Sequence, residues 1–414
     1  LVADLAKEQR LGTLNFIRLS PQSSQKILLG KLLGVPILIY LAGAISLPLH
    51  LWANISSDLP LDWLFGFYGA LVAACFFFYN ASVFFVFLGI TQAWLAAAIT
   101  GIFLFPFILI MQLYTDDIPN IIATYKMNLL LIGGAIIISG VVLANYWIWQ
   151  AVNRLYKNPS ATVISKKQSY WLIGCFQVYL LLFFLVANIR NLAYVAEEYL
   201  IVFCTVNLFW FLLVIAMLSP QRQSIQDWAR YRHQQVNNDE TTIVKGAAIS
   251  LKQDLIWSEK SPALVAIGIN LVITAVMGIS WILLWQDNTI KLSAILTLIL
   301  SFNLILIYAA IAQFILLIKV KNPAIWAIGI LSSLIFLQPL VLIFIIHPVQ
   351  SPNLWLFSTF PWFSIGQDSL AIAPMLIAII SQWSILTLVT FLLTRKIQKL
   401  GASDSQKLLI DQKN

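Results

Sequence analysis

Charged residues are scarce in this chain: Lys, Arg, Asp and Glu make up only 10% of its 414 residues. Soluble domains carry roughly 25% of such residues. Hydrophobic residues, by contrast, make up 60% of the chain. A protein of this length could not hide so much apolar surface from water, so the composition predicts a protein whose solvent is lipid.

Cysteine and histidine are also rare, which argues against disulfides and metal sites. The cysteines fall within apolar runs, where they are typical of small buried side chains: Cys75, Cys175 and Cys204. The histidines are too scattered to predict a zinc site: His50, His233 and His347. An outer metal site or a membrane-embedded hydrolase near His50 and His347 is a minor alternative, because no nucleophile–base spacing supports it.

The sequence contains no G-x-x-x-x-G-K-[ST] phosphate-binding loop, and it therefore predicts no ATP-binding domain. We expect no enzymatic activity and no cofactor in the chain itself. Any ATP hydrolysis that drives it would take place on a separate subunit.

Apolar stretches of about 20 residues predict an all-α bundle of about ten transmembrane helices. They lie at 32–53, 62–88, 93–114, 127–150, 170–189, 199–218, 263–285, 292–318, 324–346 and 370–394. The break at residues 89–92 carries no charge, so one long bent helix is the alternative there.

The basic residues support this order of spans. If residues 1–31 are cytoplasmic, all but three of the 25 Lys and Arg fall in inner segments, the exceptions being Lys126, Arg190 and Lys291. Both ends of the chain are then predicted to be cytoplasmic. The net charge of +8 would face anionic lipid headgroups, so we expect membrane lipid and no nucleic acid as a partner.

Apart from Asp62, the first residue of the span 62–88, no Asp, Glu, Lys or Arg falls within a predicted span. Ion-coupled transporters usually need an ionisable group at membrane depth, which counts against a secondary transporter. The polar residues inside the spans are neutral: Asn80, Gln177, Asn207, Asn270, Asn303, Gln313, Gln338 and Gln382. They favour hydrogen bonds between helices, and a substrate path is the alternative interpretation.

Residues 5–31 are the most informative segment outside the spans. Leu5 to Leu19 is compatible with a helix, and Leu11, Leu14 and Ile17 recur at roughly helical spacing. Ser20-Pro21 breaks this helix, and Ser23 or Ser24 can cap the next one. The pattern predicts a short cytoplasmic helix between two membrane spans, and a helix lying on the lipid surface is the alternative.

Glu-x-x-x-Gly-Thr-Leu, Leu-Ser-Pro and Ile-Leu-x-Gly-Lys follow one another here, from Glu8 to Lys31. This order resembles the permease subunits of type-2 ATP-binding-cassette exporters, and it is closest to cyanobacterial members. In that family the stretch links the second span to the third, and its short helix docks on a separate ATPase subunit. The resemblance implies five ATPase-docking residues: Glu8, Arg10, Gly12, Thr13 and Leu14.

The resemblance also implies two six-span halves, with two spans preceding Leu1. Residues 1–169 would hold the last four spans of the first half, with the coupling segment at 5–31. Residues 170–414 would form the second half, with a cytoplasmic loop at 220–262. That loop lacks the Gly-Thr-Leu pattern, so its possible second docking helix, with Ile225, Trp228 and Arg230, competes with a merely solvated loop.

We therefore expect the permease of an ATP-driven exporter, in the inner membrane of a prokaryote or in a thylakoid membrane. Its partner would be a separate ATPase. The uncharged spans suit a hydrophobic or lipid-linked substrate better than an ion. A polytopic scaffold or assembly factor that transports nothing is the first alternative, and a secondary transporter is the second.

Overall fold

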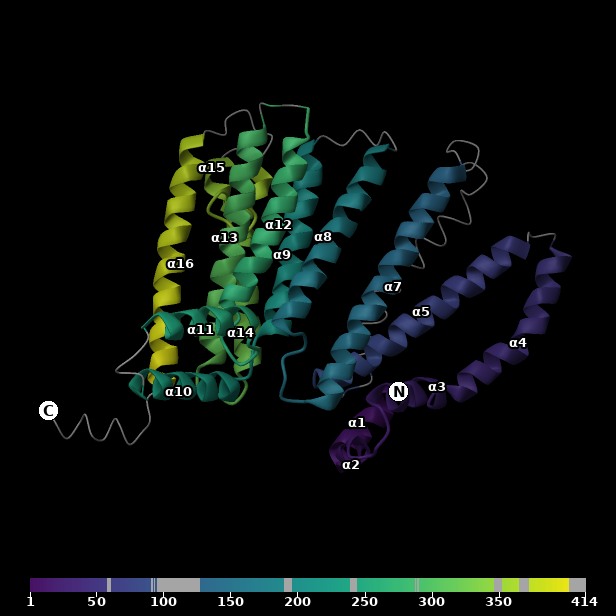
Figure 1. Cartoon of the computed structure of the whole chain (residues 1–414). Coiled ribbons are helices and arrows are strands. Elements are labelled where there is room, and N and C mark those ends of the chain that lie inside the picture. Colours follow the sequence, from purple (N-terminus) through teal and green to yellow (C-terminus); the bar gives the residue numbers. More distant parts are fainter. Residues whose placement is uncertain are drawn as a thin grey trace. The chain divides into compact units, whose positions relative to one another are not determined.

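The computed structural model describes residues 1–57, 61–90, 92, 94, 127–189, 196–238, 244–286, 288, 290–345, 352–364 and 372–401. These residues form helices and short connections, and no strand occurs among them, as Figure 1 shows. The predicted all-α class is confirmed for this part of the chain. Contacts between Cα atoms divide the chain into two compact units, Leu1–Val163 and Ile164–Asn414.

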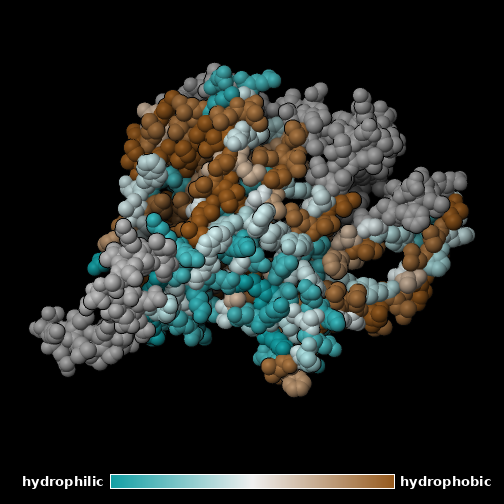
Figure 2. Space-filling view, in the orientation of Figure 1, coloured by the Kyte–Doolittle hydropathy of each residue, from teal (hydrophilic) through white to brown (hydrophobic). Residues whose placement is uncertain are grey.

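Among the described residues, seven helices are long and apolar enough to cross a membrane, as expected of a helical membrane protein. In the second unit, Figure 2 shows hydrophobic side chains (brown) over the upper part of the helices and hydrophilic ones (teal) below, where the helices labelled α10 and α11 lie. Each predicted span overlaps a described long helix except 93–114, of which only Trp94 is described. The total of ten spans stays a prediction.

The first unit consists of three short helices followed by longer ones. They are α1 (Val2–Leu11), α2 (Thr13–Arg18), α3 (Ser24–Gly34), α4 (Ile37–Ser56), α5 (Leu61–Phe87) and α7 (Met127–Lys157). The short helices lie against the long ones, with α1 on α5 and α3 on α7.

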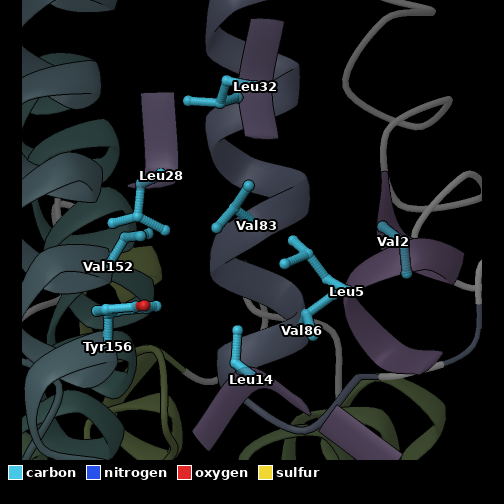
Figure 3. Packing of buried hydrophobic residues seen from close by; sticks show 9 residues of the cluster. All are labelled: Val2, Leu5, Leu14, Leu28, Leu32, Val83, Val86, Val152 and Tyr156. Atoms are coloured by element: carbon cyan, nitrogen blue, oxygen red, sulfur yellow. The ribbon is translucent and has the colours of Figure 1, made fainter. Parts of the chain in front are cut away.

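The core of this unit is a cluster that joins the short helices to α5 and α7. Its members are Val2, Leu5, Leu14, Leu28, Leu32, Val83, Val86, Val152 and Tyr156, shown in Figure 3. Leu28 lies near Val152, and Leu5 lies near Val86. Residues 2–32 are therefore packed on their own unit by apolar burial, and each fully buried leucine contributes about 1.5–3 kcal/mol.

The second unit holds the remaining helices. They are α8 (Lys166–Ile189), α9 (Ala196–Leu218), α10 (Arg222–Asn238), α11 (Val244–Trp257), α12 (Leu264–Leu283), α13 (Lys291–Leu316), α14 (Pro323–Ile345), α15 (Pro352–Trp355), η1 (Pro361–Ser364) and α16 (Ile372–Gly401). α13 is central, because α9, α12, α14 and α16 all contact it. In α13, 72% of the membrane-length apolar stretch is buried inside the protein, whereas in α4 of the first unit the share is 6%.

Two sequence predictions need correction. The predicted span 32–53 starts too early, because α3 ends at Gly34 and a turn at Val35–Pro36 separates it from α4. Proline lacks an N–H and disfavours helix at the residue before it. The merely solvated loop considered for 220–262 is also wrong, since α10 and α11 form there and pack against α16, α8 and α12.

The described part of the segment between α14 and α16 is buried inside the second unit. α15 and η1 are short helices, and Trp355, Leu356 and Trp362 are each at most 2% exposed. Leu356 packs against α13 and α16, in one cluster with Leu300 and Met375. Residues 352–364 are therefore a re-entrant segment within the helical bundle.

This segment reaches the middle of the neighbouring helices. The Thr359 hydroxyl is 2.9 Å from the Tyr308 hydroxyl, and it donates to the carbonyl of Leu334 at 3.3 Å. Tyr308 is about 25 Å along α13 from its first residue. Because a helical side chain points back toward the N-terminus, its hydroxyl lies nearer the middle of α13. Leu334 lies halfway along α14. Non-helical backbone is tolerated at such depth where protein surrounds it.

Candidate functional site

The predicted coupling segment is a bent pair of helices. α1 ends and α2 begins at Gly12, whose φ of 74° lies in the left-handed region. Glycine adopts this conformation without the steric cost that a Cβ imposes. The Thr13 hydroxyl donates to the Glu8 carbonyl at 3.2 Å, which caps the end of α1. The single helix predicted over Leu5–Leu19 is therefore broken at Gly12.

The bend changes which side chains face outward. Leu14 is 2% exposed and belongs to the core of the first unit, whereas Leu11 is 66% exposed. The single apolar face predicted from Leu11, Leu14 and Ile17 is therefore wrong, because the turn at Gly12 shifts the helical register. The apolar residues that the bend presents outward are Leu11, Phe16 and Leu19, with the exposed Arg10 beside them in sequence.

Glu8 is held within the unit by an ion pair. Its Oε1 pairs with Lys31 Nζ on α3, and the two side chains are only 23% and 15% exposed, respectively. The other carboxylate oxygen, Oε2, is buried and has no hydrogen-bond partner among the described residues. Glu8 and Leu14 thus hold the bend in place, Gly12 and Thr13 shape it, and Arg10 is left exposed.

Arg18 fixes the far end of the bend to α7. Its guanidinium lies 5.3 Å from the ring centroid of Tyr156 and donates to Asn15 Oδ1 at 2.9 Å. Both residues lie outside the predicted spans. Burial lowers the pKa of Arg18 and raises the pKa of Tyr156, and the proximity of the two groups opposes both shifts. A cation–π contact of this kind contributes about 0.5–2 kcal/mol.

The possible second docking helix is α10, and its three predicted residues have different surroundings. Ile225 is 2% exposed and packs with Leu317 and Leu393. Trp228 is half-buried, and Arg230 is exposed. The predicted face of Ile225 and Trp228 is thus turned toward the unit itself, while Arg230 lies on the outer side.

α10 also approaches the end of α16 very closely. A Cβ on Gly401 would lie 2.9 Å from the carbonyl oxygen of Ala229, so only glycine fits without a shift. On the same helix, Arg222 Nε donates to the Leu317 carbonyl at 3.2 Å, at the end of α13. Movement of α10 would therefore act directly on the ends of two central helices.

A polar network that the sequence did not predict joins α10 to α8. Asp254 on α11 accepts from Trp228 Nε1 at 3.2 Å and from Arg232 Nη2 at 2.7 Å. The Asp254 carbonyl accepts from the Ser261 hydroxyl at 2.7 Å, and that hydroxyl accepts from Lys166 Nζ at 2.6 Å. The one available signal was the i, i+4 spacing of Trp228 and Arg232, which places both on one helix face.

Lys166 ends this network at a helix C-terminus. Its ammonium is buried and also donates to the carbonyls of Leu255 at 2.8 Å and Pro262 at 3.1 Å. Tyr170 donates to the neighbouring carbonyl of Ile256 at 2.8 Å. The last carbonyls of a helix carry partial negative charge, which favours a cation there. The start of α8 is thereby fixed to the end of α11.

Most of the neutral polar residues predicted inside spans make hydrogen bonds between helices. Asn80 donates to Asn145 at 2.9 Å, Gln177 to Asn207 at 2.6 Å, and Asn270 to Ser169 at 2.9 Å. Gln313 accepts from the Ala263 amide, and Gln338 donates to the Phe357 carbonyl on the re-entrant segment. These residues are therefore structural, as the first interpretation predicted.

Two of these residues remain candidates for a substrate path. Asn303 Nδ2 and Gln382 Oε1 are buried without a hydrogen-bond partner among the described residues. They lie about one turn beyond Leu300 and Ile379, which pack together between α13 and α16. The side-chain amides of Asn303 and Gln382 therefore lie at similar heights along α13 and α16, one turn beyond the apolar contact between these helices.

The described residues hold no group of three His, Cys, Asp or Glu side chains that could bind a metal ion. His50 Nδ1 lies 2.8 Å from the Tyr68 hydroxyl, and His347 lies outside the described residues. Comparison with protein-family models, curated proteins and solved structures finds no match. The resemblance to exporter permeases therefore stays a prediction, based on residues 8–31.

Proposed function

We propose that the chain is the membrane-spanning permease of an ATP-driven exporter, powered by a separate ATPase that docks on the bend between α1 and α2. The observation that supports this most is the bend itself. It lies outside the long apolar helices, it is fixed to α5 and α7 by buried leucines, and it presents Leu11, Phe16 and Leu19 outward. An apolar surface on a rigid support suits a protein partner.

The same arrangement supports a mechanical role. Force on the bend would reach α5 through Leu5 and Leu14, and α3 through the pair of Glu8 with Lys31. In the second unit, α10 would act on α13 and α16 through Arg222 and Ala229. We place both surfaces on the cytoplasmic side of a prokaryotic inner or thylakoid membrane, as the basic residues favour.

The uncharged spans favour a hydrophobic or lipid-linked substrate over an ion. Asn303 and Gln382 are the polar groups that such a substrate could contact, because their free amide atoms face no protein partner among the described residues. Replacing either residue by leucine would then reduce transport without preventing ATPase association.

Docking is tested by recovery of an ATPase with the protein from its native membrane in mild detergent. The double substitution Phe16→Asp and Leu19→Asp should reduce recovery of a phosphate-loop ATPase at least tenfold, because buried apolar contacts dominate binding energy at such interfaces. Leu284→Asp is the matched control, since Leu284 is 83% exposed and Leu19 is 84% exposed. Equal recovery from both variants would refute the docking surface.

Glu8 calls for a charge swap rather than a simple reversal, because it already pairs with Lys31. Glu8→Lys should displace the bend and reduce ATPase recovery, and adding Lys31→Glu should restore it. Rescue would identify Glu8 as a positioning residue. Recovery of no ATPase from the intact wild-type protein would instead favour the non-transporting scaffold.

A further inference from the structure

A groove of about 510 Å³ runs along the first unit between α3, α5 and α7. Its walls include Gln25 and Leu29 from α3, Phe76 from α5, and Val142, Tyr146 and Trp149 from α7. Leu29, Phe76, Val142 and Tyr146 are each 40–62% exposed, so the groove is open along its length. Its volume is in the range of roughly 300–1,000 Å³ that ligand sites occupy.

The walls offer very little hydrogen bonding. Asn145 also lines the groove, but its amide is already hydrogen-bonded within the protein. Its Oδ1 accepts from Asn80 at 2.9 Å, and its Nδ2 donates to the Val141 carbonyl at 3.1 Å. A peptide in the groove would leave its backbone polar groups without partners, at a cost of several kcal/mol for each group in an apolar medium. A hydrocarbon chain has no such groups.

One end of the groove lies at the basic end of the unit. Gln25 and Trp149 line that end, and the adjacent Ser24 hydroxyl bonds to Asn153 near the end of α7. Arg154 and Lys157 follow in the last turn of α7. Tryptophan and tyrosine are enriched where hydrocarbon meets headgroups, which is the environment expected for Tyr146 and Trp149.

The charge at this end favours an anion. The exposed Lys26 lies three residues before Leu29, so both occupy neighbouring positions on α3. Residues 1–31 and 151–163 hold seven basic side chains, Lys7, Arg10, Arg18, Lys26, Lys31, Arg154 and Lys157, against two acidic ones, Asp4 and Glu8. Glu8 is already paired with Lys31, which leaves the excess positive.

We propose that this groove binds one anionic phospholipid, with an acyl chain along Leu29, Phe76 and Val142 and the headgroup phosphate at Gln25 and Lys26. Basic pockets at the headgroup level between membrane helices are the setting in which anionic lipids are recognised. Such a lipid would join α3 to α5 and α7, and so stabilise the support of the α1–α2 bend. This inference does not depend on the exporter proposal, because it requires neither an ATPase nor transport.

The test is native mass spectrometry of the full chain in mild detergent, with added phosphatidylglycerol or phosphatidylcholine of identical acyl chains. The wild type should retain phosphatidylglycerol in preference to phosphatidylcholine. Lys26→Gln should reduce that preference roughly fivefold, the effect of one basic residue near an anionic lipid. Lys321→Gln, at another exposed lysine, in the second unit, should leave the preference for phosphatidylglycerol unchanged.

A second variant tests the chain-binding part. Val142→Trp should fill the groove and abolish retention of both lipids, whereas Val178→Trp, at a 49% exposed valine on α8, should have no effect. Equal retention of the two lipids by the wild type would overturn the proposal. So would a Val142→Trp protein that keeps its lipid, or a wild-type protein that retains neither lipid.

Discussion

Single residues shape the bend that we propose as the docking surface. Gly12 supplies a left-handed turn, Leu14 fixes α2 to the core, and Glu8 joins α1 to α3. The resemblance selected these positions as docking contacts, yet the side chains of Glu8 and Leu14 face their own unit. The docking role of these residues stays a prediction, and the structure shows that two of the five side chains contact their own unit instead of facing outward.

Gly12→Ala should loosen the bend. No atom lies within 4 Å of the position that a Cβ would take, so the cost is the left-handed backbone alone, about 1–2 kcal/mol. Trypsin cleavage after Lys7 and Arg10 should accelerate roughly 5- to 30-fold if cleavage follows the opened population. Gly30→Ala is the control, because Gly30 is helical with equally open surroundings and should be neutral or slightly stabilising.

Asp254→Ala should release α10 from α11. It removes the acceptor of Trp228 and Arg232, and hydrogen bonds to charged groups contribute about 1.5–3 kcal/mol. The Asp254 side chain is 31% exposed, so we expect the effect to be nearer 1 kcal/mol. Amide hydrogen exchange along α10 should rise about fivefold. Asp227→Ala on the exposed side of the same helix should leave exchange unchanged, and an equal rise in both variants would contradict the network.

Whole helices were more predictable than single contacts. About 20 apolar residues in succession have few alternatives to crossing a bilayer, so α8, α9, α12, α13 and α14 begin and end within a few residues of their predictions. Pro36 marks the break before α4 in the sequence, but the predicted span 32–53 runs through it. Apolar content alone could not place it, because Leu32 and Leu33 read as part of the same run.

The re-entrant segment was harder to predict because it is too short to cross the membrane and carries two prolines. Its burial depends on contacts with α13, α14 and α16, which lie in different parts of the sequence. The signal that could have revealed it is composition: residues 352–364 contain Trp, Phe and Leu and no charged residue. An outer segment in water would be expected to carry more polar side chains.

Thr359→Val should weaken the attachment of this segment. The variant keeps the shape of threonine but loses the contacts with Tyr308 and with the Leu334 carbonyl. Hydrogen bonds between membrane helices average about 0.6 kcal/mol, so a modest fall in Tm is expected. A double-mutant cycle with Tyr308→Phe should give a coupling energy of similar size. Thr387→Val is the control, since the Thr387 hydroxyl donates to the Trp383 carbonyl within its own helix, and additive effects in the cycle would exclude the contact between Thr359 and Tyr308.

At the scale of the whole molecule, the two compact units have the same internal arrangement of helices. In each, long apolar helices form the body, and short polar helices lie at one end: α1 and α2 in the first, α10 and α11 in the second. The units Leu1–Val163 and Ile164–Asn414 meet six residues before the predicted boundary at 169. Lys166 and Ser169 belong to the second unit, because they bond to Ser261 and Asn270.

The orientation of the whole chain follows from charge and can be measured with cysteine labelling. α13 has 26 residues, about 39 Å of helix, which exceeds the roughly 30 Å hydrocarbon core. Asn288 before it and Lys321 after it are exposed, and if α13 crosses the membrane they face opposite sides. The positive-inside rule assigns Lys321 and Gln223 on α10 to the cytoplasm. An impermeant maleimide should therefore label Asn288→Cys in intact cells, and Lys321→Cys and Gln223→Cys only after permeabilisation.

The wild type provides the background for this experiment, because Cys204 is buried and Cys75 and Cys175 are half-buried within predicted spans. Reversed labelling of all three variants would show that the orientation is the opposite of the predicted one. The α10 surface would then lie on the side away from any cytoplasmic ATPase, and the exporter proposal would be refuted. Labelling of Asn288→Cys and Lys321→Cys from the same side would mean that α13 does not cross the membrane. Since α13 is the central helix of the second unit, that result would require a different order of spans throughout it.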